Sequence, residues 1–263
     1  MKQILVSNID KSWPAIEINY HKPVDLFIDS FHGFNETKDS FKILWVKEAE
    51  AISNFKKLAI NNFKFFDAIL AYDEDILKNC PNSHMMLFGT SWVHNYKFNK
   101  KQFQISHLTG NKNWTIGHKM RQEIHRRQNE IFITKDFYIS SHGSIDNHYN
   151  NKILLNEKEP LFDSEFHICV ENSIQKNYFT EKLIDCLITK TVPIYFGCPN
   201  IGDFFDTRGM IIANNANEII SAVNSLNKQV YSQKKYFIDK NYELAKPFVT
   251  LTDRLQSVIS NIL

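Results

Sequence analysis

The sequence predicts an α/β fold made of two doubly wound lobes. Short apolar runs alternate with helix-like segments over the first hundred residues, and a second alternating series runs from Phe103 to about residue 245. A polar stretch at 94–102 separates the two series and is predicted to be a linker. Because strands separated by helices indicate βαβ units and a mainly parallel sheet, we expect an N-terminal lobe at 1–98 and a C-terminal lobe at 99–263.

In the N-terminal lobe the apolar runs predict four short strands and one helix. The strands are expected at 4–6, 25–28, 43–46 and 68–71, and the helix at 52–65. After the last strand, Asp73 stands directly before two acidic residues and an apolar pair, a pattern typical of the N-cap and first turn of a helix.

In the C-terminal lobe two strands end in polar clusters and are followed by helices. A strand at 103–108 leads into a loop at 110–113 and then a helix whose apolar stripe includes Met120 and Ile124. A strand at 166–170 leads to a helix that begins near Glu181. The final amphipathic segment, 251–263, is predicted to be a helix that packs back on the N-terminal lobe.

Composition indicates which partners and which cellular compartment to expect for this protein. A net charge of +2 in 263 residues does not indicate a nucleic-acid partner, and we expect none. The basic run that starts at His118 and ends at Arg127 is interpreted as a solvated helix face. Four cysteines without CxxC spacing are predicted to be buried free thiols in a reducing compartment. No signal peptide and no apolar run long enough for a transmembrane segment is found, so we expect a cytoplasmic protein.

The stretch from Phe166 to Gly197 predicts an anion site. Ligands of open α/β sheets bind beyond the carboxyl ends of the strands, where a helix N-terminus offers unpaired N–H groups. Here Glu171, Asn172 and Ser173 follow a strand, and Lys182 lies in the first turn of the next helix. A lysine at that end of a helix opposes the dipole and therefore indicates an anionic partner, for which we suggest a phosphate.

These residues resemble the donor-binding signature of the α-1,3/4-fucosyltransferases, glycosyltransferase family 10. The matching segments are Glu171-Asn172-Ser173, Tyr178, Thr180-Glu181-Lys182 and Pro193-Ile194-Tyr195-Phe196-Gly197, within a similarity that is strongest over 103–206. The resemblance implies two Rossmann-like lobes in a GT-B arrangement with an inter-lobe cleft. It also implies inverting transfer of L-fucose from GDP-fucose to an oligosaccharide acceptor, in α-1,3 linkage to N-acetylglucosamine or glucose, by an enzyme of the soluble microbial or viral type.

The resemblance also implies roles for individual residues. Arg121 and Lys182 are expected to bind the diphosphate, and Glu181 the ribose. The donor-binding residues are Arg121, Asn172, Tyr178, Thr180, Glu181 and Lys182, with Glu171, Ser173, Asn111 and Lys112 as further candidates. A capping Asn and a packed Tyr remain the alternative interpretation of Asn172 and Tyr178.

Glu48 is the predicted general base. It follows the strand at 43–46, so its carboxylate is expected at the carboxyl edge of the sheet, and family members carry a Glu after the corresponding strand. Glu50 is the rival, because on an extended continuation both carboxylates could face the same side.

Asp73-Glu74-Asp75 raises a competing chemistry, because it matches the Asp-x-Asp motif of metal-dependent glycosyltransferases. The capping pattern at Asp73 opposes this interpretation, and the fixed cations Arg121 and Lys182 can neutralise a diphosphate without a metal. We therefore expect no cofactor and no divalent metal. Two other functions stay open: transfer of another GDP-linked 6-deoxy sugar, and a non-catalytic module that binds nucleotides or glycans.

Overall fold

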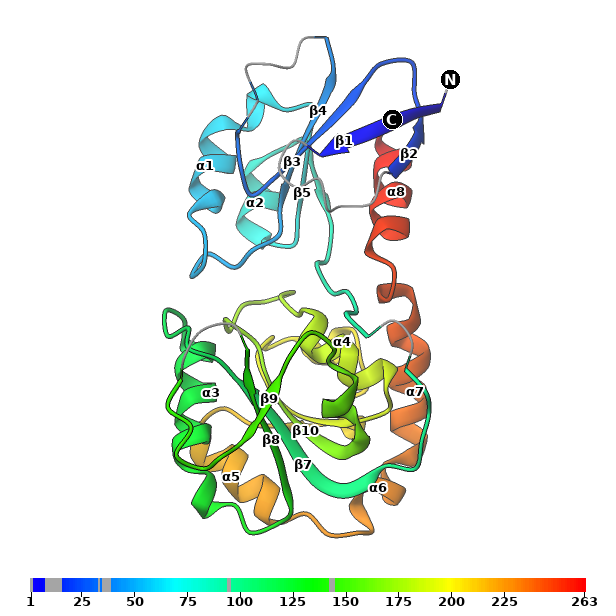
Figure 1. The fold of residues 1–263 in the computed structure, drawn as a ribbon. Helices are drawn as coiled ribbons and strands as arrows, with labels where there is room; N and C mark the ends of the chain where they lie inside the picture. The colour runs from blue at the N-terminus through cyan, green and yellow to red at the C-terminus, as the bar shows by residue number, and fades with distance from the viewer. Residues whose placement is uncertain (1, 8–15, 33, 35–38, 94–95, 142–144) are drawn as a thin grey trace. The chain divides into compact units, whose positions relative to one another are not determined.

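The computed structural model describes residues 2–7, 16–32, 34, 39–93, 96–141 and 145–263. The chain forms two compact units, which Figure 1 shows with their elements labelled. Unit 1 contains Met1–Phe88, Lys176–Tyr178 and Thr250–Leu263, and unit 2 contains Gly89–Gln175 and Phe179–Val249. The chain thus changes unit after Phe88, whereas the sequence pattern places the boundary at residue 98.

Unit 1 is built on a six-stranded sheet in the order β2-β1-β3-β4-β5-β6. β1 and β2 pair antiparallel, and the other neighbours pair parallel. The strands are β1 (Lys2–Ser7), β2 (Ile16–Asn19), β3 (Val24–Ile28), β4 (Phe41–Val46), β5 (Ala68–Ala71) and β6 (Ser83–Met85).

The helices of unit 1 cover both faces of this sheet. Ile43 and Trp45 of β4 pack in one cluster with α8 (Leu251–Ile262), which Figure 1 draws in red. Leu44 and Val46 point to the opposite face, against residues of α1 (Phe55–Asn62) and α2 (Glu74–Asn79). This alternation is the period of two expected for a strand buried on both faces. The predicted helix at 52–65 is shorter, because residues 52–54 form a turn and Phe63–Phe65 is a 3-10 turn.

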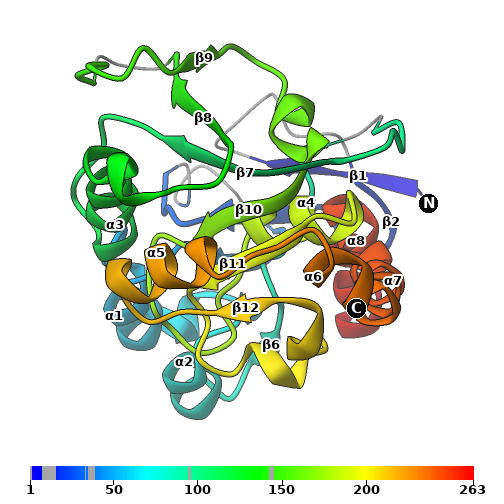
Figure 2. The ribbon, with the colours of Figure 1, turned by 90° about the horizontal axis from the view of Figure 1, so that it is seen from below.

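Unit 2 is built on a second six-stranded sheet, entirely parallel, in the order β12-β11-β10-β7-β8-β9. Figure 2 shows the strands in this sequence. Counted along the chain this is the 3-2-1-4-5-6 order of the Rossmann fold, with its switch point between β7 and β10. The strands are β7 (Gln102–Thr109), β8 (Lys135–Ser140), β9 (Lys152–Leu154), β10 (Ser164–Val170), β11 (Val192–Phe196) and β12 (Ile211–Ile212).

The helices of unit 2 also lie on both faces. Apolar side chains of α3 (Ile116–Arg126) and α5 (Ala216–Asn224) share a core cluster with Phe166, Ile168 and Val170 of β10. Cys169 points to the other face, where it contacts Cys186 of α4 (Glu181–Ile188). The remaining helices are α6 (Val230–Gln233) and α7 (Lys235–Ala245).

The structure bears on two predictions made from composition, the state of the cysteines and the lack of a transmembrane segment. All four cysteines are free and buried, which confirms the predicted state of the thiols. Within the residues that the structure describes, no helix combines the length and apolar character needed to cross a membrane.

Candidate functional site

The candidate site lies at the switch point of unit 2, where the carboxyl ends of β7 and β10 are neighbours. α3 begins in direct contact with the end of β10: the Gly117 N–H donates to the Asn172 carbonyl over 3.2 Å. A Cβ on Gly117 would lie 1.7 Å from the Glu171 carbonyl oxygen, so no other residue fits there without moving the helix. Thr115 closes the start of α3 with a capping box to His118.

Arg121, one turn into α3, reaches the residues that follow β10. Its guanidinium donates to the Val170 carbonyl over 2.5 Å and to Asn172 Oδ1 over 2.8 Å. His107 of β7 bonds the Arg121 carbonyl over 3.1 Å, which attaches this turn of the helix to the strand. Two predicted donor-binding residues, 51 positions apart in sequence, are therefore in contact.

Glu171 is a structural partner of α4. Its carboxylate accepts from the Thr180 N–H over 2.9 Å and from the Thr180 hydroxyl over 2.7 Å. Thr180 is the N-cap of α4 and accepts in turn from the Lys182 N–H. Burial raises the pKa of Glu171, which is completely enclosed. The carboxylate therefore ties the start of α4 to the end of β10.

Lys182 and Glu181 form a charged pair in the first turn of α4. The Lys182 ammonium lies 2.9 Å from Glu181 Oε1 and 3.1 Å from Thr180 Oγ1. Burial alone would raise the pKa of Glu181, but Lys182 and Lys158 outweigh it and lower that pKa. Burial alone would lower the pKa of Lys182, but Glu181 and Glu171 outweigh it and raise that pKa. Both side chains are therefore ionised at neutral pH.

His118 shows how closely the cations gather. Burial, together with the nearby positive charges of Arg121, Lys112 and Lys182, lowers its pKa to about 4. These cations come from the loop after β7, from α3 and from α4, so three segments bring positive charge near His118.

The other two candidates near this point lie in loops. Asn111 is exposed in the loop after β7, beside Lys112, whose ammonium lies 5.6 Å from the centre of the exposed Trp114 ring. Ser173 is half-buried in the loop that follows β10.

Lys158 was not predicted as a site residue. Its ammonium lies 3.5 Å from Glu181 Oε1 and 4.0 Å from the centre of the Trp92 ring. The buried Asp185, one turn after Glu181, accepts from the Ser91 hydroxyl and the Trp92 N–H. Burial raises the pKa of Asp185 to about 6. The spacing of Glu181 and Asp185 on one helix face was visible in the sequence, but no pattern pointed to Lys158.

Tyr178 belongs to unit 1. Its side chain is 1% exposed and packs with Ala49 and Tyr72, the two rings lying 5.4 Å apart between centroids. This environment agrees with the alternative interpretation of a packed tyrosine, and a donor-binding role for Tyr178 stays a prediction.

Glu48 lies just beyond the end of β4 in unit 1, where the chain bends instead of continuing as an extended strand. Its carboxylate is 28% exposed and lies 3.4 Å from the Lys47 ammonium. Glu50 is more exposed, at 46%, and approaches Lys56, which also pairs with Asp73 and Asp75. The two glutamates thus have different surroundings: each lies within 4 Å of one lysine, but the lysine beside Glu50 is shared with Asp73 and Asp75.

Asp73 is the N-cap of α2, as the sequence predicts. Its carboxylate accepts from the N–H groups of Asp75 and Ile76. The Lys56 ammonium lies 3.2 Å from Asp73 and 2.5 Å from Asp75, so a fixed cation already bridges the motif. Across the described parts of the chain, no cluster of three or more His, Cys, Asp or Glu side chains could hold a metal ion.

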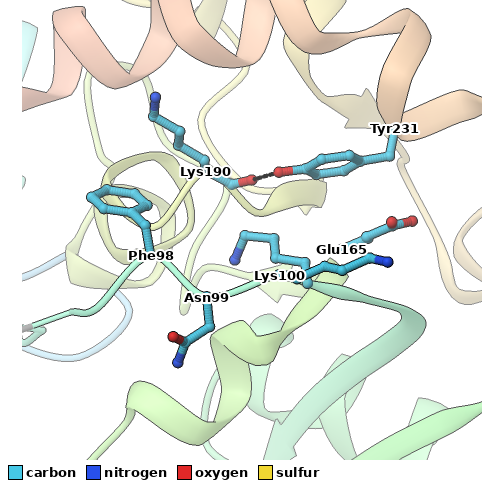
Figure 3. Close-up of a pocket in the computed structure, with 7 residues that line it drawn as sticks. Phe98, Asn99, Lys100, Glu165, Lys190 and Tyr231 are labelled. Atoms are coloured by element: carbon cyan, nitrogen blue, oxygen red, sulfur yellow. Dashed lines mark hydrogen bonds between the residues drawn. The ribbon is translucent and has the colours of Figure 1, made fainter.

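Unit 2 also has a pocket of about 400 Å³ at the opposite edge of its sheet. Residues before β7, at the start of β10 and before β11 line it, together with Tyr231 of α6, which donates to the Lys190 carbonyl (Figure 3). None of the predicted donor-binding residues lines this pocket.

Comparison with known proteins identifies relatives of the C-terminal region. Residues 105–257, more than half of the chain, match the description "Glycosyltransferase family 10 (fucosyltransferase) C-term". An alpha-(1,3)-fucosyltransferase FucT of Helicobacter pylori is 30% identical over 107 residues, which are 40% of this chain and 22% of that protein. The match thus spans about a fifth of the length of this relative.

Solved structures resemble nearly the whole chain. TarM superposes with a TM-score of 0.59 at 14% identity, covering 91% of this chain and 54% of TarM. An alpha1,3-fucosyltransferase with GDP superposes with a TM-score of 0.52 at 17% identity, covering 91% of this chain and 77% of that chain. At such identities the likeness concerns the fold, and it confirms the predicted α/β class with two Rossmann-like units of GT-B type.

Proposed function

Because this chain belongs to glycosyltransferase family 10, we propose that it transfers L-fucose from GDP-fucose to a hydroxyl group of a glycan. The observation that carries the proposal is the contact of Arg121 with Asn172 and the pairing of Lys182 with Glu181 at the switch point of unit 2. This point is where open α/β sheets bind nucleotides.

In the proposed reaction the donor diphosphate binds Arg121 and Lys182. A planar guanidinium binds phosphate oxygens in pairs, and the ammonium of Lys182 adds a point charge at the N-terminus of α4. The ionised Glu181 carboxylate accepts hydrogen bonds from ribose hydroxyls. Lys112 adds charge from the loop after β7. Since these cations are fixed before the reaction, they can stabilise the leaving GDP without a divalent metal.

Glu48 is the proposed base. It takes the proton of the acceptor hydroxyl while that oxygen attacks the anomeric carbon, and the bond from this carbon to the β-phosphate oxygen breaks with its electron pair leaving on GDP. Attack from the side opposite the leaving group inverts the anomeric configuration. We propose N-acetylglucosamine or glucose in a glycan as acceptor, in α-1,3 linkage, on the basis of the family.

Two measurements test the proposal. A ligand that binds only the folded state stabilises it by about 2.7 kcal/mol at a hundredfold excess over Kd, so GDP should raise the melting temperature and UDP or CMP should not. Fucosyl transfer to a lactosamine acceptor should then survive EDTA. Stabilisation by UDP sugars with manganese, or activity that EDTA abolishes and manganese restores, would contradict it.

A further inference from the structure

Asp29, directly after β3, holds the segment that carries Glu48. Its own N–H donates to the Trp45 carbonyl over 2.9 Å, and its carboxylate accepts from the Lys47 N–H over 3.0 Å. The Glu48 N–H donates to the same carboxylate, at 3.4 Å from Oδ1 and 3.3 Å from Oδ2. Asp29 therefore forms hydrogen bonds with three backbone groups at the end of β4.

The Glu48 backbone is also held from the side of β5, the other strand next to β4. The Tyr72 hydroxyl, just beyond β5, donates to the Glu48 carbonyl over 3.3 Å. Because β3 and β5 flank β4 in the sheet, the peptide groups on both sides of the Glu48 Cα are anchored. The direction of a Cα–Cβ bond follows from the backbone, so these bonds fix the direction in which the Glu48 side chain leaves the chain.

The backbone of Asp29 is unusual. Its φ is 43°, in the left-handed region, which is uncommon for residues other than glycine and costs of the order of 1 kcal/mol. The carboxylate is also half-buried: burial raises its pKa to about 6, against the lowering effect of Lys47 and the two N–H donors. A strained backbone and a half-buried acid are both unfavourable by themselves, and both are explained if the three bonds to β4 are needed.

We propose that Asp29 is a positioning residue for Glu48, acting through hydrogen bonds from its carboxylate to the peptide groups of Lys47 and Glu48. The inference rests on the proposed function, in which Glu48 is the base. Asp29 itself touches neither donor nor acceptor. Its removal should lower kcat, and the affinity for GDP should stay unchanged because the proposed donor-binding cations belong to unit 2.

The test compares three variants in the full chain at pH 8, where Asp29 is ionised. Asp29→Gly removes the carboxylate, and glycine accepts a positive φ without strain. Asp29→Asn keeps an oxygen acceptor, and asparagine also tolerates this conformation. Asp67→Gly is the matched control. The Asp67 carboxylate accepts from the Lys42 N–H over 2.7 Å, near the start of β4, whereas Asp29 bonds the segment at the end of β4.

We expect Asp29→Gly to lower kcat by about 10- to 100-fold, the scale of a misplaced catalytic group, with GDP affinity unchanged. Asp29→Asn should recover most of the rate, and Asp67→Gly should leave kcat within about twofold of wild type, as for an acid far from the base. Equal rates in Asp29→Gly and wild type would overturn the inference. A loss of rate in Asp29→Asn as large as in Asp29→Gly would also overturn it, because charge and not hydrogen bonding would then matter.

Glu48→Gln separates this inference from the proposed function. If Glu48→Gln turns over at the wild-type rate, Glu48 is not the base, and the proposed mechanism fails whatever Asp29 does. If Glu48→Gln is inactive while Asp29→Gly is normal, the base stands and only the positioning role is wrong.

Discussion

At the scale of single residues, charge is balanced before any ligand arrives. Lys182 is paired with Glu181, and Glu181 is paired a second time with Lys158. Under the proposed function, an incoming diphosphate would pair with Lys182 while Lys158 continues to neutralise Glu181. This arrangement keeps a buried carboxylate paired throughout, which matters because an unpaired buried charge costs several kcal/mol.

Lys182→Ala tests the role of the ammonium. We expect kcat to fall by about 10²- to 10³-fold, the range seen when one electrostatic donor to a developing negative charge is removed. Lys152→Ala is the control, since its ammonium bonds the buried Asp136 over 2.6 Å and Lys152 is not one of the proposed donor-binding residues. Steady-state fucosyl transfer measures both variants. Wild-type turnover in Lys182→Ala, or an equal loss in Lys152→Ala, would show that the donor site lies elsewhere.

His107 predicts a pH dependence of stability. Burial lowers its pKa to about 4, against about 6.5 for a histidine in the unfolded chain. Between these values only the unfolded state binds the proton, so the contribution of His107 is complete above pH 6.5 and is lost as the pH falls toward 4. It amounts to about 3 kcal/mol. Urea unfolding at pH 7 and at pH 4 gives the loss of unfolding free energy between these two pH values. This loss should be about 3 kcal/mol smaller for His107→Gln than for wild type. Equal losses would contradict the buried neutral histidine.

At the scale of elements, the site depends on how closely α3 approaches β10. The Cβ of Gly117→Ala would meet the Glu171 backbone, so the helix must move away and take Arg121 with it. We expect a loss of about 2 to 4 kcal/mol in unfolding free energy and weaker GDP binding. Gly110→Ala, in the loop between β7 and α3, is the matched control, because its Cβ would lie 3.6 Å from its nearest neighbour, an ordinary contact. Chemical denaturation and GDP titration of both variants give the answer, and equal stabilities would refute the close approach.

The sequence predicts those elements whose patterns are long and continuous. The strand before Glu171 and the helix from Glu181 were both expected, because an apolar run, a polar turn and a helical stripe follow each other within a short stretch. β6, β9 and β12 have only two or three residues each and were not predicted, since so few residues show no period.

The residues of the candidate site also differ in how far the sequence predicts them. Residues 171–182 could be predicted because local order places them on one loop and one helix. Their contact with Arg121 depends on β7 lying beside β10, which is a property of strand order and not of either segment. Lys158 and Asp29 escaped prediction for the same reason: each acts on a group that is distant in sequence, through contacts that only the folded sheet creates.

At the scale of the whole molecule, each unit has its own apolar core, and the chain crosses between the units more than once. The core of unit 2 is formed by residues between Ile105 and Ile238. Unit 1 is completed by the last helix, since Leu255 and Ile259 are fully buried against strand residues such as Trp45. The N-terminal segment, Met1–Phe88, therefore needs the C-terminal helix in order to bury one face of its sheet.

This organisation predicts that the two proposed activities, GDP binding and fucosyl transfer, can be separated. Replacing Leu255 and Ile259 of α8 with alanine removes apolar contacts worth about 2 to 5 kcal/mol each, which should unfold or loosen unit 1. Fucosyl transfer should be lost, while GDP binding should persist because Arg121 and Lys182 belong to unit 2.

The matched variant replaces Ile219 and Val223, two fully buried residues on α5 of unit 2, with alanine. It removes a similar amount of apolar surface, but from the core beneath the candidate donor site, so transfer and GDP binding should both be lost. Isothermal titration with GDP and a transfer assay on the two double variants make the comparison, with circular dichroism to follow each melting transition. Loss of GDP binding in the α8 variant, together with one cooperative transition, would mean that the two units fold as a single body and that the donor site cannot form without unit 1.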